Sequence, residues 1–262
     1  MASRLDGRVV VVTGGGRGIG RSLALAAARE GARVAITSRT QRELDAVVAE
    51  VRALGSDALA VTADALSRGE TQAAIARVLA HFGRIDGVVN NAGGGVGWKP
   101  APGKDRDEHE DELFEANLRL NLTSAYYATR FALPAMRAQR WGRVITIGSG
   151  FAKRSGGALA YSAAKHGLVG LTRAWAAQLA GEGITVNCLC PGWTNTSLVD
   201  WNALAKAYGT DAAGAKRIAE GDNLQHRVLE PDELGPMCAL LLSDDARGIT
   251  GQVISVDGGY KV

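Results

Sequence analysis

The sequence predicts an α/β protein with a Rossmann-like, doubly wound sheet of about seven parallel strands and helices on both faces. Short β-branched runs alternate along the chain with Ala- and Leu-rich segments of helical periodicity. These runs are apolar throughout, which is typical of parallel strands that are covered on both sides. A helix between successive strands is the connection that a parallel sheet requires.

The expected elements alternate along the whole chain. Strands are predicted over residues 9–13, 33–37, 58–62, 85–90, 143–147, 185–189 and 252–256. Helices are predicted over residues 18–30, 41–54, 70–81, 160–180 and 232–242, with a further helical interval around 111–137. No linker or repeat divides them, so we expect residues 1–262 to form a single domain.

The turn after the second strand is bounded by helix signals. Thr40 followed by Glu43 has the spacing of a capping box, and Gly55 stands where a glycine commonly ends a helix. These signals confine Ser38 and Arg39 to the turn between strand and helix. Ligands of open parallel sheets bind beyond the carboxyl ends of the strands, which is where this turn lies.

Composition excludes several classes of function. The formal net charge is +3 with both signs interspersed, so nothing favours a nucleic-acid partner. The mixed charge run over residues 104–112 is interpreted as a solvated helix start, and its His109-Glu110 pair lacks the second histidine of a zinc helix, so no metal site is expected. No apolar run is long enough to cross a membrane.

The cysteines favour the reducing cytoplasm. Three are present, Cys188, Cys190 and Cys238, and no secretory leader is evident at the polar start of the chain. Cys188 and Cys190 alternate on one face of a predicted strand. We interpret them as small buried apolar residues in preference to a redox pair or metal ligands.

A glycine-rich turn follows the first strand. Residues 13–20 do not fit G-x-G-x-x-G in any register, but they fit Thr-Gly-x-x-x-Gly-x-Gly. Glycines let the backbone approach a pyrophosphate, and the N-terminus of the next helix offers free N–H groups and positive charge. This position between strand and helix favours a nucleotide site.

A second candidate site combines three side chains. Tyr161 and Lys165 are four residues apart in a predicted helix and therefore share one face. Ser149 follows the strand at 143–147, at the ligand edge of the sheet. In isolation, Tyr161 and Lys165 would be a helix-surface pair, Ser149 a turn residue and Asn121 a polar residue of a helix interior.

Together these motifs resemble the short-chain dehydrogenase/reductases, in their compact single-domain branch. The resemblance extends from the first strand to the C-terminus. It includes the glycine-rich turn and the following positions: Asn90 to Gly93, Asn121, Ser149, Tyr161, Lys165, Pro191-Gly192, Ile249 to Gln252 and Asp257 to Gly259.

The resemblance implies a catalytic set. Tyr161 is expected to exchange a proton with the substrate oxygen, and Lys165 to stabilise its phenolate and hold the nicotinamide ribose. Ser149 is expected to hydrogen-bond the substrate oxygen, and Asn121 to hold a water that relays protons towards Lys165. The implied activity is that of a short-chain alcohol dehydrogenase or ketoreductase, transferring hydride between NAD(P)(H) and a carbonyl or secondary alcohol of a small to medium-sized molecule.

The resemblance also implies the cofactor contacts. They are expected at Gly14, Gly16, Arg17, Gly18, Ile19, Gly20, Ser38, Arg39, Asp64, Asn91, Ala92, Gly93, Tyr161, Lys165, Pro191, Gly192, Thr194 and Thr196. Asp64 matches the position that contacts adenine in the family.

Charge favours NADP(H) over NAD(H). An acidic residue at the end of the second strand would bind a free ribose 2′-hydroxyl and repel a 2′-phosphate, and the turn Thr37-Ser38-Arg39 has none. Arg39 and Arg17 are suited to clamp that phosphate. Arg39 could equally be a solvated residue, which leaves NAD(H) open.

The substrate pocket is expected in the loops after the fourth, fifth and sixth strands, with a lid at about 193–225. Its candidate substrate-binding residues are Trp98, Ser149, Phe151, Trp193 and Trp201. Lys153 and Arg154 are either contacts for an anionic group or solvated loop charges. The family suggests a homotetramer or homodimer. Two alternatives stay open, a non-catalytic nucleotide-binding regulator and an epimerase or dehydratase that uses the same Tyr/Lys pair.

Overall fold

The computed structural model describes residues 3–95 and 106–261, and its centre is a seven-stranded sheet. All the strand pairings are parallel, in the order β3-β2-β1-β4-β5-β6-β7. The strands are β1 (Val9–Thr13), β2 (Arg33–Ser38), β3 (Ala58–Thr62), β4 (Gly87–Asn90), β5 (Gly142–Ile147), β6 (Ile184–Pro191) and β7 (Val253–Val256). The fold class predicted from the sequence is confirmed.

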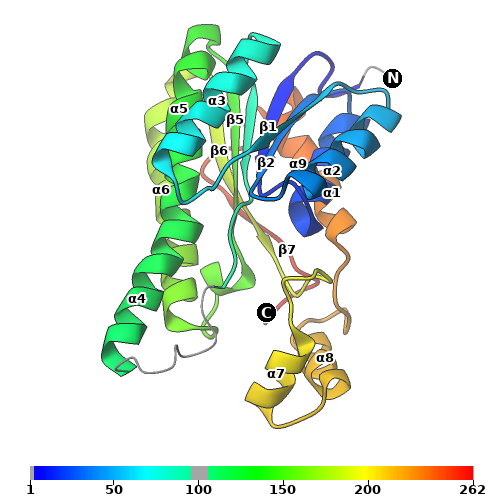
Figure 1. Ribbon diagram of the computed structural model, residues 1–262, viewed down its shortest axis with the longest axis vertical. Coiled ribbons are helices and arrows are strands. Elements are labelled where there is room, and N and C mark those ends of the chain that lie inside the picture. Colours follow the sequence, from blue (N-terminus) through cyan, green and yellow to red (C-terminus); the bar gives the residue numbers. More distant parts are fainter. Residues whose placement is uncertain (1–2, 96–105, 262) are drawn as a thin grey trace.

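Helices cover both faces of the sheet (Figure 1). One face carries α1 (Gly18–Arg29), α2 (Gln41–Ala53) and α9 (Gly235–Leu242), which share a hydrophobic core with the sheet. The other carries α3 (Arg68–Phe82), α5 (Ser124–Gln139) and α6 (Leu159–Leu179), which form a second core. Outside these layers lie α4 (Arg106–Leu118) and the pair α7 (Trp201–Tyr208) and α8 (Ala212–Gly221).

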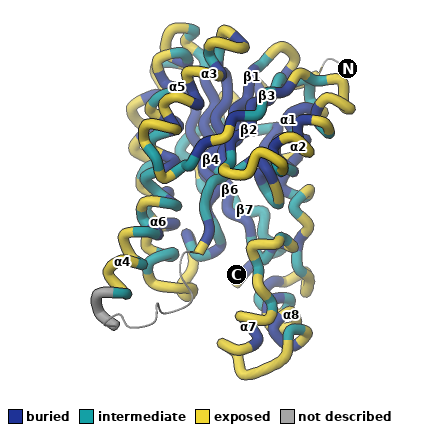
Figure 2. The backbone as a smooth tube through the Cα atoms, in the orientation of Figure 1, coloured by how far each residue is buried: buried dark blue, intermediate teal, exposed yellow. Residues whose placement is uncertain are grey.

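The period of two along each strand divides the two cores. Val10 and Val12 of β1 pack with α1, α2 and α9, whereas Val9 and Val11 pack with α3, α5 and α6. Figure 2 shows the strands as the most buried part of the molecule, with exposed residues on the outer faces of the helices. This two-sided burial explains why the strands are apolar at every position.

The strand order reverses direction between β1 and β4. The chain runs outwards from β1 to β3 and then crosses to the other side of β1. The chain therefore leaves β1 and β4 towards opposite sides of the sheet, which makes their carboxyl ends the switch point at which open α/β sheets bind ligands.

The predicted capping box of α2 is wrong. Thr40 is the N-cap residue, but its side chain makes no capping bond. Its backbone N–H donates to Ser38 Oγ at 3.3 Å, and the Glu43 carboxylate turns away to pair with Arg17 at 3.5 Å. A charged partner across the turn replaces the reciprocal bond that the sequence spacing suggested. Gly55 does follow the helix, with φ +83°.

The helical interval around 111–137 contains a break in register. Helix α4 passes through a π-helical turn, Arg119–Thr123, before continuing as α5. Such turns insert one residue into the helix and are frequent at functional sites. Asn121 lies in this turn and is buried.

Two helices within residues 193–225 were not predicted from the sequence. Both begin at an aspartate cap: Asp200 accepts from Asn202 and Ala203, and Asp211 accepts from Gly214. Helices of eight and ten residues carry too little periodicity to be recognised, so only the caps could have indicated them. They project from the main body of the molecule beyond the C-terminal ends of the strands (Figure 1).

Among the residues that the structure describes, no helix combines the length and apolarity needed to span a membrane.

Candidate active site

The glycine-rich turn is tightly folded against the neighbouring strands. Gly14 has φ +63° and Gly18 has φ +53°, conformations that L side chains rarely adopt. Gly15 N–H donates to Thr37 O of β2 at 3.0 Å. A Cβ on Gly20 would lie 2.2 Å from Gly14 O, so the first turn of α1 packs directly against the backbone of the loop.

Asn91 ties the turn after β4 to the glycine-rich turn. Its Nδ2 donates to Thr13 O and Gly14 O at 3.0 Å each. The backbone N–H groups of Asn91 and Ala92 donate to Thr13 Oγ1 at 3.1 and 3.0 Å. The two sides of the switch point are therefore fixed relative to each other.

Lys165 reaches from α6 to the end of β5 although it is buried. Its Nζ donates to Ile147 O at 2.8 Å. A Cβ on Gly93 would stand 3.3 Å from Lys165 Nζ and 2.8 Å from Asn121 Oδ1. The absence of a side chain at Gly93 therefore allows both polar groups to approach the turn after β4.

Asn121 holds that same turn with both ends of its amide. Its Oδ1 accepts from Gly94 N at 2.9 Å and its Nδ2 donates to Gly94 O at 2.9 Å. The Nδ2 also donates to Asn117 O, in the last turn of α4, at 3.1 Å. This pairing satisfies both backbone polar groups of Gly94, which is buried.

Tyr161 lies on the same helix face as Lys165. The Lys165 Nζ is 5.6 Å from the centroid of the Tyr161 ring. Tyr161 is half-buried and packs edge-on against Phe151, with ring centroids 6.5 Å apart. Ser149, also half-buried, accepts from Phe151 N at 3.2 Å, and its loop follows β5 directly.

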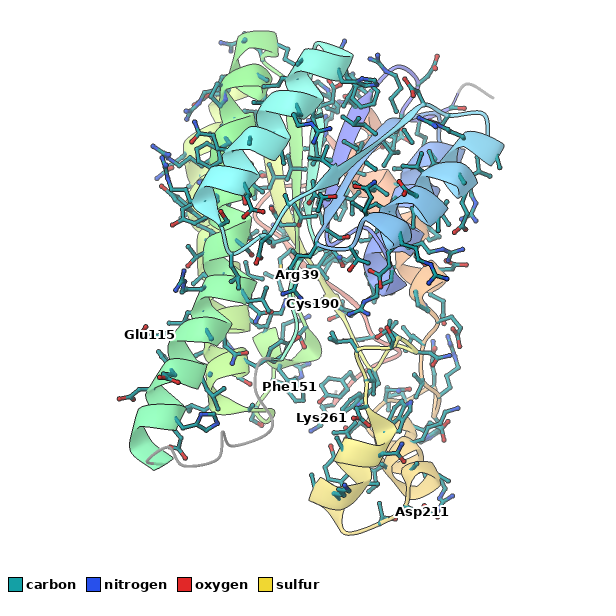
Figure 3. All side chains as sticks on the ribbon, in the orientation of Figure 1. Arg39, Glu115, Phe151, Cys190, Asp211 and Lys261 are labelled. Carbon is teal, nitrogen blue, oxygen red and sulfur yellow. The ribbon has the colours of Figure 1, made fainter. Side chains whose placement is uncertain are left out.

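The turn after β2 presents polar and charged groups to solvent. Arg39 is exposed, and no ion pair or side-chain hydrogen bond to it is recorded among the described residues (Figure 3). Ser38 Oγ lies 3.0 Å from the position of a Cβ on Gly16. Asp64, in the turn after β3, accepts from Leu66 N at 2.9 Å.

The segment after β6 returns across the site. Pro191 ends β6, and a Cβ on Gly192 would lie 2.8 Å from Asp257 O. Thr194 Oγ1 donates to Gly192 O at 3.0 Å. Thr196 approaches Gly18, whose Cβ position is 3.3 Å from Thr196 Cγ2.

The aromatic residues of the expected substrate side lie in two groups. Trp193 and Trp201 have ring centroids 6.0 Å apart, and Trp193 Nε1 donates to Asp222 Oδ2 at 2.9 Å. Phe151 packs between Tyr161 and Tyr260, whose ring centroid is 5.9 Å away. Trp98 lies outside the described residues. Lys153 donates to Ser255 Oγ at 2.8 Å.

The sequence did not point to three residues around the site. Tyr260 packs against Phe151, and burial raises the pKa of its phenol, as does nearby Asp222. Lys261 lies next to it, with Nζ 5.9 Å from the Phe151 ring (Figure 3). Leu198 contacts the position of a Cβ on Gly94 at 3.0 Å. No local motif marks these residues, because each is placed by chain segments that are distant in sequence.

The three cysteines are buried and unpaired, as their interpretation as small apolar residues predicts. Cys188 and Cys190 have sulfur atoms 3.7 Å apart beneath the loop that carries Ser149. The two thiols share a hydrogen bond in which either sulfur can donate, and this contact lowers the pKa of Cys188 and raises that of Cys190. Burial alone raises the pKa of Cys238 to about 12.

This fold and site define a class of protein: a doubly wound α/β sheet with a glycine-rich turn at its switch point and a Tyr/Lys pair at the same edge. Residues 14–261 match the family model described as Enoyl-(Acyl carrier protein) reductase. The chain belongs to the short-chain dehydrogenase/reductase family, as the sequence motifs predicted.

Its relatives cover nearly the whole chain. D-beta-hydroxybutyrate dehydrogenase of Cupriavidus necator is 34% identical over 98% of this chain and 98% of its own. The 3-oxoacyl-[acyl-carrier-protein] reductase of Thermotoga maritima is 32% identical over 99% of this chain and 100% of its own. Levodione reductase of Leifsonia aquatica is 34% identical over 99% of this chain and 96% of its own.

Solved structures agree with this assignment. The crystal structure of levodione reductase gives a TM-score of 0.88 at 32% identity, over 97% of this chain and 98% of that one. A variant of actinorhodin polyketide ketoreductase with NADPH gives 0.87 at 33% identity, over 100% and 99%. The expectation that the protein is an oxidoreductase of this family is confirmed.

Proposed function

We propose that the protein transfers hydride between NADP(H) and a carbonyl or secondary alcohol group of a small to medium-sized molecule. The observation that carries the proposal is the meeting of Lys165, Asn121 and Gly93 at the edge of the switch point, with Tyr161 on the same helix face as Lys165. The bound nicotinamide supplies or accepts the hydride. Levodione reductase and the two reductases of ketoacyl type are named for ketone chemistry, which supports the same class of reaction here.

The residues present fit a dinucleotide. The glycines at 14, 16, 18 and 20 let the loop pack closely against its neighbours next to the N-terminus of α1, whose free N–H groups bind a pyrophosphate favourably. Gly93 leaves room in front of Lys165 and Asn121. We assign the pyrophosphate to the turn at 14–20, the ribose of the nicotinamide to Tyr161 and Lys165, and the adenosine to the turns at Arg39 and Asp64. The remaining contacts are proposed at Ser38, Asn91, Ala92, Pro191, Gly192, Thr194 and Thr196.

In the proposed mechanism Tyr161 donates its hydroxyl proton to the substrate oxygen during reduction and takes it back during oxidation. The ammonium of Lys165 stabilises the phenolate that remains, and Ile147 O keeps that ammonium in place. Ser149 donates a hydrogen bond to the substrate oxygen. Asn121 orients the turn after β4 and a water that leads protons towards Lys165.

Replacing the phenol tests this mechanism. In Tyr161→Phe we expect turnover to fall by about a hundredfold or more, because the general acid is lost, while the Kd for the cofactor stays within a few-fold. Tyr126→Phe is the matched control, because Tyr126 lies on α5, stacked against Trp175, and is not part of the proposed site. Full activity in Tyr161→Phe would show that another group supplies the proton.

Cofactor preference is tested separately. We propose that Arg39 and Arg17 favour NADP(H), because the turn after β2 contains no carboxylate and its Arg39 has no ion-pair partner in the part of the chain that the structure describes. The kcat/KM for NADPH should exceed that for NADH, and Arg39→Asp should reverse the preference by removing a cation and adding an anion. Equal or better use of NADH by the unaltered enzyme would overturn the assignment.

The substrate pocket is proposed between Phe151, Trp193 and Trp201, next to Ser149 and Tyr161, with residues 193–225 as its lid. The lid belongs to the single domain formed by residues 1–262. Apolar aromatic walls suit a substrate larger than a simple aldehyde. Absorbance at about 340 nm, followed with ketones, acyl thioesters, sugars and steroids, identifies the substrate class from nicotinamide turnover.

We also propose a cytoplasmic enzyme that assembles as a homotetramer or homodimer. Three unpaired thiols are consistent with a reducing compartment. Phe114 on α4 and Tyr126 on α5 are exposed aromatic residues of the kind that subunit contacts cover. Light scattering of the purified chain measures its assembly directly.

A further inference from the structure

We infer that Glu43 is a specificity-determining residue. It weakens binding of the cofactor's 2′-phosphate and so reduces the preference for NADP(H) over NAD(H). The inference rests on the function proposed above. Glu43 is in the first turn of α2, not in the turn after β2 where an acidic residue would be sought. The sequence suggested only a capping role for it, and the structure shows that it does not have that role.

The position of the carboxylate carries the inference. Glu43 Oε2 lies 3.2 Å, and Ser38 Oγ 3.0 Å, from the point where a Cβ on Gly16 would stand. The carboxylate is therefore in the same small space as the Ser38 hydroxyl, between the glycine-rich turn and the turn after β2. Arg17 reaches this space through its pair with Glu43, and Arg39 follows Ser38 directly in the chain, so this is where we expect the 2′-phosphate to bind.

Glu43 also forms an ion pair with Arg17, one of the two cations proposed to bind the phosphate. Its Oε1 is 3.5 Å from Arg17 Nη1, with the Arg17 side chain 64% and the Glu43 side chain 33% exposed. The carboxylate also interacts favourably with the positive, N-terminal end of the α2 dipole, because Glu43 is in the first helical turn. Of the two arginines proposed to bind the phosphate, Arg17 is paired with Glu43, and no carboxylate partner of Arg39 is seen among the described residues.

The charges predict a difference between the two cofactors. A 2′-phosphate carries up to two negative charges, so it must either displace the carboxylate or bind beside it against charge repulsion. A 2′-hydroxyl is neutral and can donate a hydrogen bond to the carboxylate. One unit charge at about 4 Å from another in a water-like dielectric changes binding by about sixfold, and the effect on a dianion is larger. NADP(H) affinity therefore responds to the charge of Glu43, and NAD(H) affinity does not gain from its removal.

The experiment measures the Kd of NADP⁺ and NAD⁺ by calorimetry at low salt for the unaltered enzyme, Glu43→Gln and Glu50→Gln. Glu43→Gln keeps the shape and removes the charge, so we expect NADP⁺ to bind about five- to tenfold more tightly while NAD⁺ binds no better. High salt should reduce this gain, because the groups are partly exposed.

Glu50→Gln is the matched control. Glu50 lies on the same helix and pairs with Arg21 of α1, with Arg21 Nε 2.9 Å from Glu50 Oε1, but it lies two turns further along α2 from the ligand edge. We expect both dissociation constants to stay within twofold of the unaltered enzyme. An equal gain in NADP⁺ affinity in Glu50→Gln would show a general charge effect and overturn the inference.

A second variant separates the effect of the Glu43 charge from the effect of its ion pair with Arg17. In Arg17→Gln the carboxylate loses its counter-charge, so NADP⁺ affinity should fall below that of the unaltered enzyme, and adding Glu43→Gln should restore it. If the ratio of the Kd for NADP⁺ to the Kd for NAD⁺ is the same in Glu43→Gln as in the unaltered enzyme, the inferred role of Glu43 is overturned and the proposed function stands. Failure of the unaltered enzyme to bind either dinucleotide would overturn the proposed function and this inference together.

Discussion

At the scale of single residues, Gly20 leaves no room for a side chain beside the carbonyl of Gly14. A Cβ at residue 20 would meet Gly14 O at 2.2 Å and Asn91 Nδ2 at 2.5 Å. Gly20→Ala must therefore move backbone atoms, and we expect a loss of about 1–3 kcal/mol in the free energy of unfolding. The Kd for the cofactor should rise as well, because the displaced loop is the proposed pyrophosphate site. Denaturant titration and cofactor binding measure both effects.

Gly170→Ala is the control for replacing glycine by alanine at a position where the added Cβ meets no other atom. Gly170 lies within α6, has nothing within 4 Å of its Cβ position and has no positive φ. Alanine favours helix there, so the free energy of unfolding should rise by up to about 1 kcal/mol. A Gly20→Ala protein as stable as the unaltered one would show that the loop is not constrained by this contact.

Sequence spacing predicted the glycine positions but not the partner of Glu43. The Thr-Gly-x-x-x-Gly-x-Gly pattern follows from local backbone needs, and the structure places these residues in one tight turn. The side chain of Glu43 had two possible partners, the backbone of Thr40 and the distant guanidinium of Arg17. Only the three-dimensional arrangement of α1 and α2 decides between them.

At the scale of elements, the π turn positions Asn121 to support the segment after β4. In Asn121→Ala the N–H and C=O of Gly94 lose their partners, and a buried unpaired group costs about 1–3 kcal/mol. We expect lower thermal stability together with reduced kcat. Asn121→Asp keeps the acceptor for Gly94 N but sets a buried carboxylate oxygen against Gly94 O and Asn117 O, so it should be destabilised as well. Gln178→Ala, at an exposed position of α6 outside the proposed site, should change neither quantity.

Equal stability of Asn121→Ala and the unaltered protein would show that the segment after β4 is held by other contacts. A loss of kcat without loss of stability would instead favour a direct role in proton transfer. Thermal unfolding and steady-state kinetics on the same preparations distinguish these results.

The sequence predicted the long elements because each has a strong period. All seven strands and the main helices were expected within a few residues of their observed bounds. The π turn was not expected, since one inserted residue hardly alters the apolar pattern over a long helical interval. The two helices at 201–208 and 212–221 were missed because they are short.

At the scale of the whole molecule, the edge of the sheet opposite the site is held by charge. Asp244 accepts from Trp141 Nε1 at 2.7 Å, Arg143 Nη2 at 3.0 Å and Arg8 Nη2 at 3.2 Å. The guanidinium carbons of Arg8 and Arg143 lie 3.7 and 4.1 Å from the centroid of the Trp141 ring. The cluster joins the residue before β1, the start of β5 and the segment after α9. Sequence alone could not predict it, because Asp244 is more than a hundred residues away from each of its three partners.

This cluster predicts a pH dependence of stability. The Trp141 N–H and then the charges of Arg8 and Arg143 lower the pKa of the Asp244 carboxyl. A carboxyl with a lowered pKa in the folded state stabilises the protein above its unfolded pKa of about 4, and this stability is lost as the pH falls through the folded value. Asp244→Asn should therefore be destabilised at neutral pH and approach the unaltered protein in acid.

The size of this loss of stability depends on how far each partner of the Arg143–Asp244 ion pair is exposed to solvent. The Arg143 side chain is 3% exposed and the Asp244 side chain 60%, so solvent screens the carboxylate, and we expect a loss of about 1–2 kcal/mol at pH 7. Asp245→Asn is the control, because the exposed Asp245 pairs only with Arg4, at 3.3 Å, among the described residues. Denaturant unfolding of the three proteins between about pH 3 and pH 7 separates the possibilities. A constant difference between Asp244→Asn and the unaltered protein across that range would assign the loss to hydrogen-bond geometry and contradict an electrostatic origin.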